Sequence, residues 1–100
     1  MFYSKQLIKY PKIKHCFFSN KNGVSQNIYK SLNCGIGSQD KRKNVIKNLQ
    51  IISKKVGCKY KNLITMNQTH SNNVKFISRN SLNKNKISCD AILTNKKEIC

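Results

Sequence analysis

The chain has very few acidic residues. Three Asp and Glu stand against 20 Lys and Arg in 100 residues, which gives a formal net charge of +17. Tryptophan is absent and Pro11 is the single proline, so collagen-like and proline-rich chains are excluded. No apolar run approaches the roughly 18 residues of a membrane span, and no apolar stretch of signal-peptide length occurs near Met1. The sequence therefore predicts one small cytoplasmic domain without a membrane partner.

The basic excess is of the kind found in nucleic-acid-binding proteins. Only two of the basic residues, Arg42 and Arg79, are arginines, and the lysines are spread along the whole chain. Base readout and bidentate phosphate contacts favour arginine, and no pattern of stacking aromatic residues accompanies the charge. A small basic nucleic-acid-binding protein is therefore one alternative, and it depends on charge alone.

The clearest helical signal lies in the middle of the chain. Four apolar residues, spaced by four, three and four positions, would line one face of a helix: Val45, Leu49, Ile52 and Val56. Ser38 or Asp40 is a suitable N-cap, and Gly57 is a suitable C-terminal stop. The sequence therefore predicts a helix over residues 40–56 whose apolar face packs against a sheet.

Short apolar segments on both sides of this helix predict strands. They cover residues 2–10, 13–18, 63–66, 74–77 and 90–94. Asn22-Gly23 predicts a tight turn with positive φ, and residues 79–88 predict a loop. The expected fold class is α+β, a mixed β-sheet packed with one main helix at about 40–56.

Candidate chemistry is sparse, because the chain has only two histidines and no CxxC, HExxH or P-loop pattern. His70 lies in a polar segment between two predicted strands, close to Gln68. Loops at strand ends often carry functional groups, but an isolated histidine there is usually a hydrogen-bonded surface residue. One histidine is too little for a zinc site, which needs three or four donors. Composition and spacing thus indicate a small basic α+β domain and no particular function.

Four segments in order resemble the motifs of one bacterial family. That family has been described in turn as a multicopper polyphenol oxidase (laccase) domain, a peptidoglycan editing factor and a zinc-dependent purine nucleoside phosphorylase. The first motif is a His with aromatic residues and Gly-Val-Ser, followed by Tyr-x-Ser-Leu-Asn, and the second is an acidic residue before Val-x-x-Asn. The third is Gln-x-His-Ser-x-x-Val and the fourth is Asp-Ala-x-x-Thr. They correspond here to residues 15–35, to Asp40 with 45–48, to 68–74 and to 90–94.

The resemblance implies a metal enzyme. In the family a His-Cys-His trio binds a catalytic zinc, and the histidine of the Gln-x-His motif is the first ligand, which makes His70 the expected metal ligand here. Copper is the older alternative for the metal. The expected substrates are purine nucleosides and phosphate, with adenosine deamination as a further activity. Gln68 and Asn33 are candidate substrate contacts, and hydrogen bonding within their own loops is an equal alternative for both.

The family domain is more than twice as long as this chain. Its cysteine ligand and second histidine ligand belong to later motifs that lie beyond Cys100. We therefore expect residues 1–100 to be the N-terminal portion of a single α/β/β/α layered domain, with an incomplete metal site and with catalytic residues unknown. The chain alone is expected to be inactive, and an inactive remnant of the enzyme is the second alternative.

Overall fold

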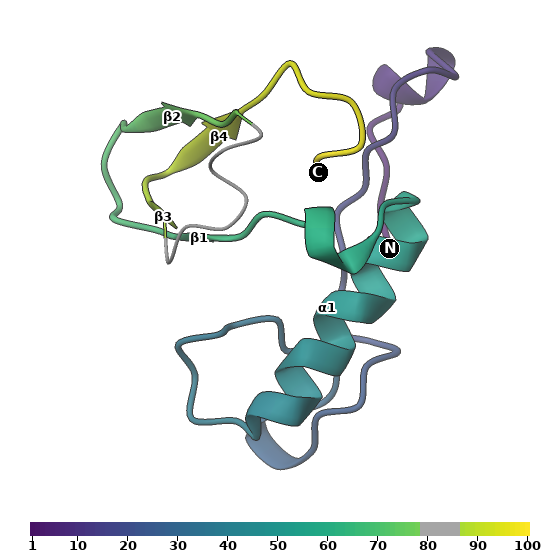
Figure 1. Ribbon diagram of the computed structural model, residues 1–100. Helices are drawn as coiled ribbons and strands as arrows, with labels where there is room; N and C mark the ends of the chain where they lie inside the picture. The colour runs from purple at the N-terminus through teal and green to yellow at the C-terminus, as the bar shows by residue number, and fades with distance from the viewer. Residues whose placement is uncertain (79–86) are drawn as a thin grey trace. The chain divides into compact units, whose positions relative to one another are not determined.

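The computed structural model describes residues 1–78 and 87–100, and the chain forms two compact units, Met1–Tyr60 and Lys61–Cys100 (Figure 1). The fold is α+β, with one main helix and small sheets, as expected from the sequence. In the described part of the chain, no helix reaches the length and apolarity that crossing a membrane requires. The elements in chain order are η1 (Leu7–Lys9), η2 (Asn27–Tyr29), α1 (Arg42–Val56), η3 (Tyr60–Asn62), β1 (Met66–Asn67), β2 (Val74–Phe76), β3 (Ile87–Ser88) and β4 (Ala91–Leu93).

Helix α1 begins two residues later than predicted. Lys41 is its N-cap and makes no capping hydrogen bond through its side chain, so the predicted caps Ser38 and Asp40 are wrong. The Asp40 carboxylate is engaged outside the helix, where it accepts hydrogen bonds from the Lys41 N–H (2.7 Å), the Ser25 hydroxyl and the Asn33 amide. These bonds hold Asp40 in the preceding loop rather than at the first helical turn.

The C-terminal stop of α1 is confirmed. Gly57 has φ of 84°, the left-handed region in which a side chain is disfavoured. Its N–H donates to the carbonyl of Lys54 (3.1 Å), and the next N–H, of Cys58, donates to the carbonyl of Ser53 (2.9 Å). This pair of bonds is a Schellman motif, which satisfies the last carbonyls of the helix.

The buried face of α1 is partly polar. Val45 and Leu49 are each 3 % exposed, whereas Ile52 and Val56 are half-buried, so the predicted stripe is most deeply buried in its first half. Asn48 lies between Val45 and Leu49 and has no exposed surface. The side-chain amide of Asn48 forms hydrogen bonds with four groups of the segment 24–33. Helix α1 therefore holds this segment in place within the first unit.

The N-terminal segments are not the strands that the sequence predicts. Residues 2–10 contain the 3₁₀ turn η1, and extended pairing is limited to one antiparallel bridge between Phe2 and Phe17. Ser4 explains the difference, because its carbonyl accepts the N–H of Ile8 (3.0 Å) and its hydroxyl accepts the N–H of Leu7 (3.3 Å). These local bonds compete with strand pairing and favour a turn.

The predicted turn at Asn22-Gly23 has a different basis from the one expected. Asn22 has the positive φ, of 68°, and Gly23 does not. Gly23 is instead required for close packing, because a Cβ at this position would lie 2.1 Å from the carbonyl oxygen of Ser31. The glycine thus permits the chain to pass against residue 31, where the Gly23 N–H also donates to the Ser31 hydroxyl (3.0 Å).

Within its described residues, the second unit has two separate two-stranded sheets, and both are parallel. Strand β1 pairs with β3, and β2 pairs with β4, whose arrows lie side by side in Figure 1. The strands predicted at 74–77 and 90–94 are confirmed as β2 and β4, whereas the strand predicted at 63–66 is shifted to β1. Residues 79–86 of the predicted loop 79–88 lie outside the described residues, and residues 87–88 form β3 instead.

Apolar side chains remain exposed on the β2–β4 sheet. Val74 and Phe76 alternate along β2 and therefore share one face, and Leu93 is the register partner of Phe76. All three are more than half exposed, at 63 %, 57 % and 60 %. The buried residues of this unit, Ile77 at 3 % and Cys89 at 0 %, lie next to these strands in the sequence.

Candidate functional site

His70 lies in the turn between β1 and β2, and its side chain is exposed. Its backbone has φ of 57°, in the left-handed region that residues with a side chain seldom adopt. Backbone conformations of this kind persist only where the surrounding structure fixes them. The groups that bond to residues 69–71 are therefore part of the site.

Asp90 supplies those bonds. One carboxylate oxygen, Oδ1, accepts the N–H of Thr69 (3.0 Å), and the other, Oδ2, accepts the hydroxyls of Thr69 (2.8 Å) and Ser71. The backbone N–H groups of His70 and Ser71 also bond to this carboxylate. The Ser71 hydroxyl, followed by the Thr69 hydroxyl and these N–H groups, holds the pKa of Asp90 well below its usual range, although desolvation opposes them.

The strands bring Asp90 to this turn. Strand β3 precedes it and pairs with β1, and β4 follows it and pairs with β2, which are the two strands that flank the turn. The N–H of Cys89 donates to the carbonyl of Asn67 (3.1 Å), and the N–H of Asp90 donates to the carbonyl of Asn73 (2.9 Å). The turn and Asp90 are therefore fixed against each other from both ends.

The predicted site residues have different surroundings. Gln68 follows β1 directly, is exposed and lies two positions before His70. Asn33 lies in the other unit, and its amide nitrogen donates to the Ser38 hydroxyl (2.9 Å) and to Asp40 (3.1 Å). The hydrogen bonding within its own loop, which the sequence left open as an alternative for Asn33, is therefore present.

Three further residues belong to the site, two from the His70 turn and one from the β3–β4 connection, and the sequence did not indicate them as site residues. They are Thr69, Ser71 and Asp90, which together fix the conformation of residue 70. The signal that could have found them is the pair of motifs Gln-x-His-Ser and Asp-Ala-x-x-Thr, which the strand pairing places side by side.

Asp40 has a related arrangement in the first unit. The hydroxyl of Ser25 is the main group that lowers the pKa of its carboxyl, with smaller contributions from Asn33 and the Lys41 N–H, and desolvation acts in the opposite direction. Asn33 and Asp40 thus belong to a polar network that closes the loop before α1.

The described residues offer few metal donors. No group of three His, Cys, Asp or Glu gathers within residues 1–78 and 87–100. His70 has an exposed imidazole, whereas the oxygens of Asp90 already accept bonds from the turn. One imidazole falls short of the three donors that hold a metal tightly, so these residues alone do not form a tight metal site.

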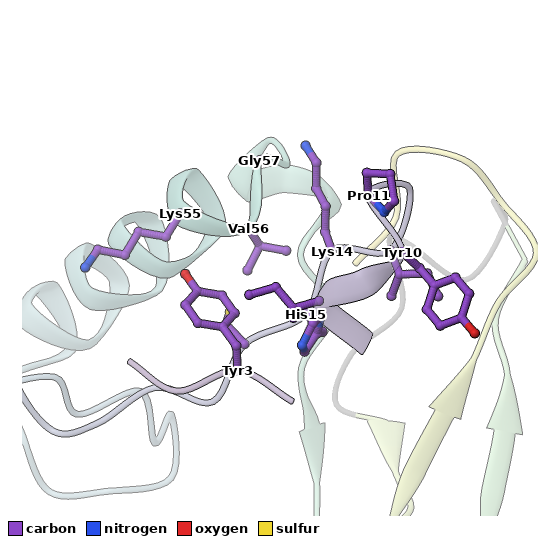
Figure 2. Close-up of a pocket in the computed structure, with 11 residues that line it drawn as sticks. Tyr3, Tyr10, Pro11, Lys14, His15, Lys55, Val56 and Gly57 are labelled. Carbon is purple, nitrogen blue, oxygen red and sulfur yellow. The ribbon is translucent and has the colours of Figure 1, made fainter. Parts of the chain in front are cut away.

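The other histidine, His15, lines a cavity of about 380 Å³ in the first unit. Figure 2 shows Tyr3 and His15 close to Val56 of α1, with the side chains of Lys14 and Lys55 extending away from the two rings. The rings of Tyr3 and His15 form an edge-to-face pair with centroids 5.8 Å apart. Nε2 of His15 accepts the N–H of Ser4 (3.0 Å), and Nδ1 is buried without a partner. His15 is therefore held by its neighbours, and its nitrogens are not directed to solvent as a ligand would be.

Comparison with known proteins identifies the family. Residues 14–100 match the family described as multi-copper polyphenol oxidoreductase laccase. The chain belongs to this family. The match includes the turn of His70 and Asp90, as the resemblance in the sequence predicted.

Individual relatives agree with this assignment. The purine nucleoside phosphorylase YlmD of Bacillus subtilis is 31 % identical over 90 residues, which cover 82 % of this chain and 32 % of the relative. Two solved structures share the fold at 17 % identity and each covers 80 % of this chain: the hypothetical protein YfiH of Bacillus licheniformis (TM-score 0.70, 33 % of its length) and YlmD of Geobacillus stearothermophilus (TM-score 0.68, 32 %). The chain spans about a third of the length of these relatives.

Proposed function

We propose that this chain supplies one metal ligand, His70, and part of the substrate site of a purine nucleoside phosphorylase. The observation that carries the proposal is the exposed imidazole of His70 on a turn that Asp90 fixes. The name of the relative YlmD of Bacillus subtilis supports the choice of reaction. In this proposal the chain is the N-terminal portion of one layered domain, and it acts in the cytoplasm.

The proposed metal is zinc, with copper as the alternative, because imidazole nitrogen suits both. When bound, such an ion activates a water molecule or polarises the substrate. His70 would hold it through a ring nitrogen, and the remaining donors would come from residues outside these 100 or from a second subunit. Adenosine deamination is a further activity in this proposal.

Gln68 is the candidate contact for the purine. Its side-chain amide has both a donor and an acceptor, which matches the mixed donor and acceptor edge of a purine base. It is exposed two positions from His70, so both side chains leave the same turn. Asn33 is the weaker candidate, since its amide already bonds to Ser38 and Asp40.

The test is reconstitution. The purified chain is combined with the part of the Bacillus subtilis relative that lies outside the aligned region, and zinc, adenosine and phosphate are added. We expect zinc-dependent release of adenine, its loss in the variant His70→Ala and its retention in the variant Asn72→Ala, an exposed residue of the same turn. The relative's own N-terminal third serves as the positive control.

Two results would overturn the proposal. The first is no turnover with this chain when the positive control is active, which is what an inactive remnant predicts. The second is equal turnover in the His70→Ala variant and in the wild-type chain. A role in nucleic-acid binding has only the net charge of +17 in its support.

A further inference from the structure

The carboxylate of Asp90 accepts several hydrogen bonds from the turn that it faces. Its two oxygens present about four lone-pair sites. Thr69 fills two of these sites with its N–H and its hydroxyl, and the Ser71 hydroxyl fills a third. The backbone N–H groups of His70 and Ser71 also lower the pKa of this carboxylate. Both oxygens of Asp90 therefore accept bonds from the turn, although Asp90 lies beside the candidate ligand.

These hydrogen bonds have a direct effect on His70. A residue with a Cβ disfavours the left-handed conformation that His70 adopts at φ of 57°. The bonds from Asp90 reach the residue before His70, the residue after it and the N–H of His70 itself. The conformation of His70 is thus set by one side chain from a distant part of the sequence.

We propose that Asp90 is a positioning residue, which holds residues 69–71 so that the imidazole of His70 is presented to metal and substrate. The proposal rests on the proposed function for its purpose, but the positioning itself can be measured without any activity. A purely structural Asp90 would instead stabilise the β3–β4 connection and leave the backbone of His70 unchanged when it is removed.

The first measurement is NMR spectroscopy of the full chain. In the variant Asp90→Ala we expect the coupling between the N–H and Hα of His70 to leave its left-handed value. Amide exchange at Thr69, His70 and Ser71 should also accelerate by about tenfold or more, since charge-assisted bonds are lost. The variant Asn72→Ala is the control and should change neither quantity. An unchanged coupling at His70 in a folded Asp90→Ala variant would overturn the proposal.

The conservative variant Asp90→Asn separates hydrogen-bond geometry from charge. Its amide oxygen can still accept the N–H of Thr69, and its amide nitrogen can donate to the hydroxyl oxygens of Thr69 and Ser71, which accept as well as donate. We therefore expect this variant to keep the coupling of His70 close to the wild-type value. Equal effects of Asn and Ala at this position would contradict the geometric account.

A gentler variant covers the case in which Asp90→Ala does not fold. The double change of Thr69→Val and Ser71→Ala removes both hydroxyl donors and leaves every backbone N–H in place. We expect a smaller rise in amide exchange at the same three residues. Exchange equal to that of the wild-type chain would show that the hydroxyl bonds do not hold the turn, which would overturn the proposal.

The second measurement uses the reconstituted enzyme. Residues that orient a metal ligand typically contribute about 10- to 100-fold to metal affinity or activity. We expect a loss of that size in kcat/KM for adenosine with Asp90→Ala, and recovery to within a few-fold with Asp90→Asn. Full activity with a displaced His70 backbone would overturn the proposal. Absence of activity in the wild-type reconstituted enzyme would contradict the proposed function. The NMR measurement would still test whether Asp90 positions His70.

Discussion

Replacing Asn48 by Asp exchanges one NH₂ group for an oxygen at a side chain without exposed surface. In the wild-type chain, Nδ2 donates to the Ser25 hydroxyl (2.9 Å) and to the carbonyls of Ser31 (3.2 Å) and Asn33 (2.8 Å). The variant Asn48→Asp keeps the shape of the side chain and the bond that Oδ1 accepts from the Val24 N–H (2.8 Å). It loses all the donors, so the new oxygen faces two carbonyl oxygens.

The expected cost is large. A buried polar group that loses its partner costs about 1–3 kcal/mol, and more when the new group is charged. Two carbonyls are affected here, whereas the Ser25 hydroxyl can turn to donate, so we expect a loss of about 3 kcal/mol or more in the free energy of unfolding. That is a substantial part of the roughly 5–15 kcal/mol that stabilises a typical protein.

The cost should also depend on pH. Burial among acceptors raises the pKa of the new carboxyl in the folded state above its unfolded value of about 3.9. A raised folded pKa means that folding favours the protonated acid, which can donate one O–H. The difference in stability between the variant and the wild type is therefore largest above the folded pKa and narrows as the pH falls toward the unfolded value.

The assay is urea unfolding followed by the circular dichroism of α1, at about pH 7 and at about pH 5. Gln50→Glu is the matched control, because it makes the same chemical change at an exposed position of the same helix. We expect the control to stay within about 0.5 kcal/mol of the wild type. A cost equally small for Asn48→Asp at pH 7 would refute the idea that this amide holds the loop to the helix.

Three further predictions concern the first unit. Leu49→Ala should lower the free energy of unfolding by about 2–5 kcal/mol, because Leu49 is 3 % exposed, and a loss below about 1 kcal/mol in the same urea assay would contradict this burial. The Ser25 hydroxyl is the main cause of the lowered pKa of Asp40, so the ionised carboxylate stabilises the fold above its unfolded pKa and this stabilisation is lost as the pH falls through the folded pKa. In the variant Asp40→Asn, the free energy of unfolding should therefore decrease less as the pH is lowered into the acid range. Gly57→Ala should destabilise by about 1 kcal/mol, since φ is 84° and the new Cβ would lie 2.7 Å from Nζ of Lys14. Gly37→Ala, where no atom lies within 4 Å of the new Cβ, is its control and should be close to neutral in thermal unfolding.

The helix was predictable because its signals are local. The spacing of Val45 and Leu49 gives the buried face, and Gly57 marks the end, so the prediction misses only the first two residues. The N-terminal strands failed because Ser4 closes a turn through bonds that no apolar pattern reveals. Strand β3 has only two residues and is defined by its pairing with β1. This pairing joins distant parts of the chain, so the polar sequence around β3 does not indicate a strand.

The sequence indicated one residue of the candidate site but not the groups that hold it in position. The Gln-x-His motif indicated His70, and its chemistry as a ligand stays a prediction. The partnership with Asp90 could not be read from spacing, because Thr69 and Asp90 are 21 positions apart and meet through the pairing of parallel strands. For Asn33 two roles were equally compatible with the sequence, and the bonds to Ser38 and Asp40 account for its amide nitrogen.

The apolar face of the β2–β4 sheet has a consequence for how the chain behaves at different ionic strengths. Val74, Phe76 and Leu93 are exposed together, and a face of this kind attracts a second copy. The net charge of +17 keeps copies apart in dilute buffer. Added salt shortens the range of this repulsion to about 3 Å at 1 M, while the attraction between apolar faces persists. The chain should therefore be dispersed at low salt and self-associate as salt is added, the reverse of the behaviour of a complex held by charge.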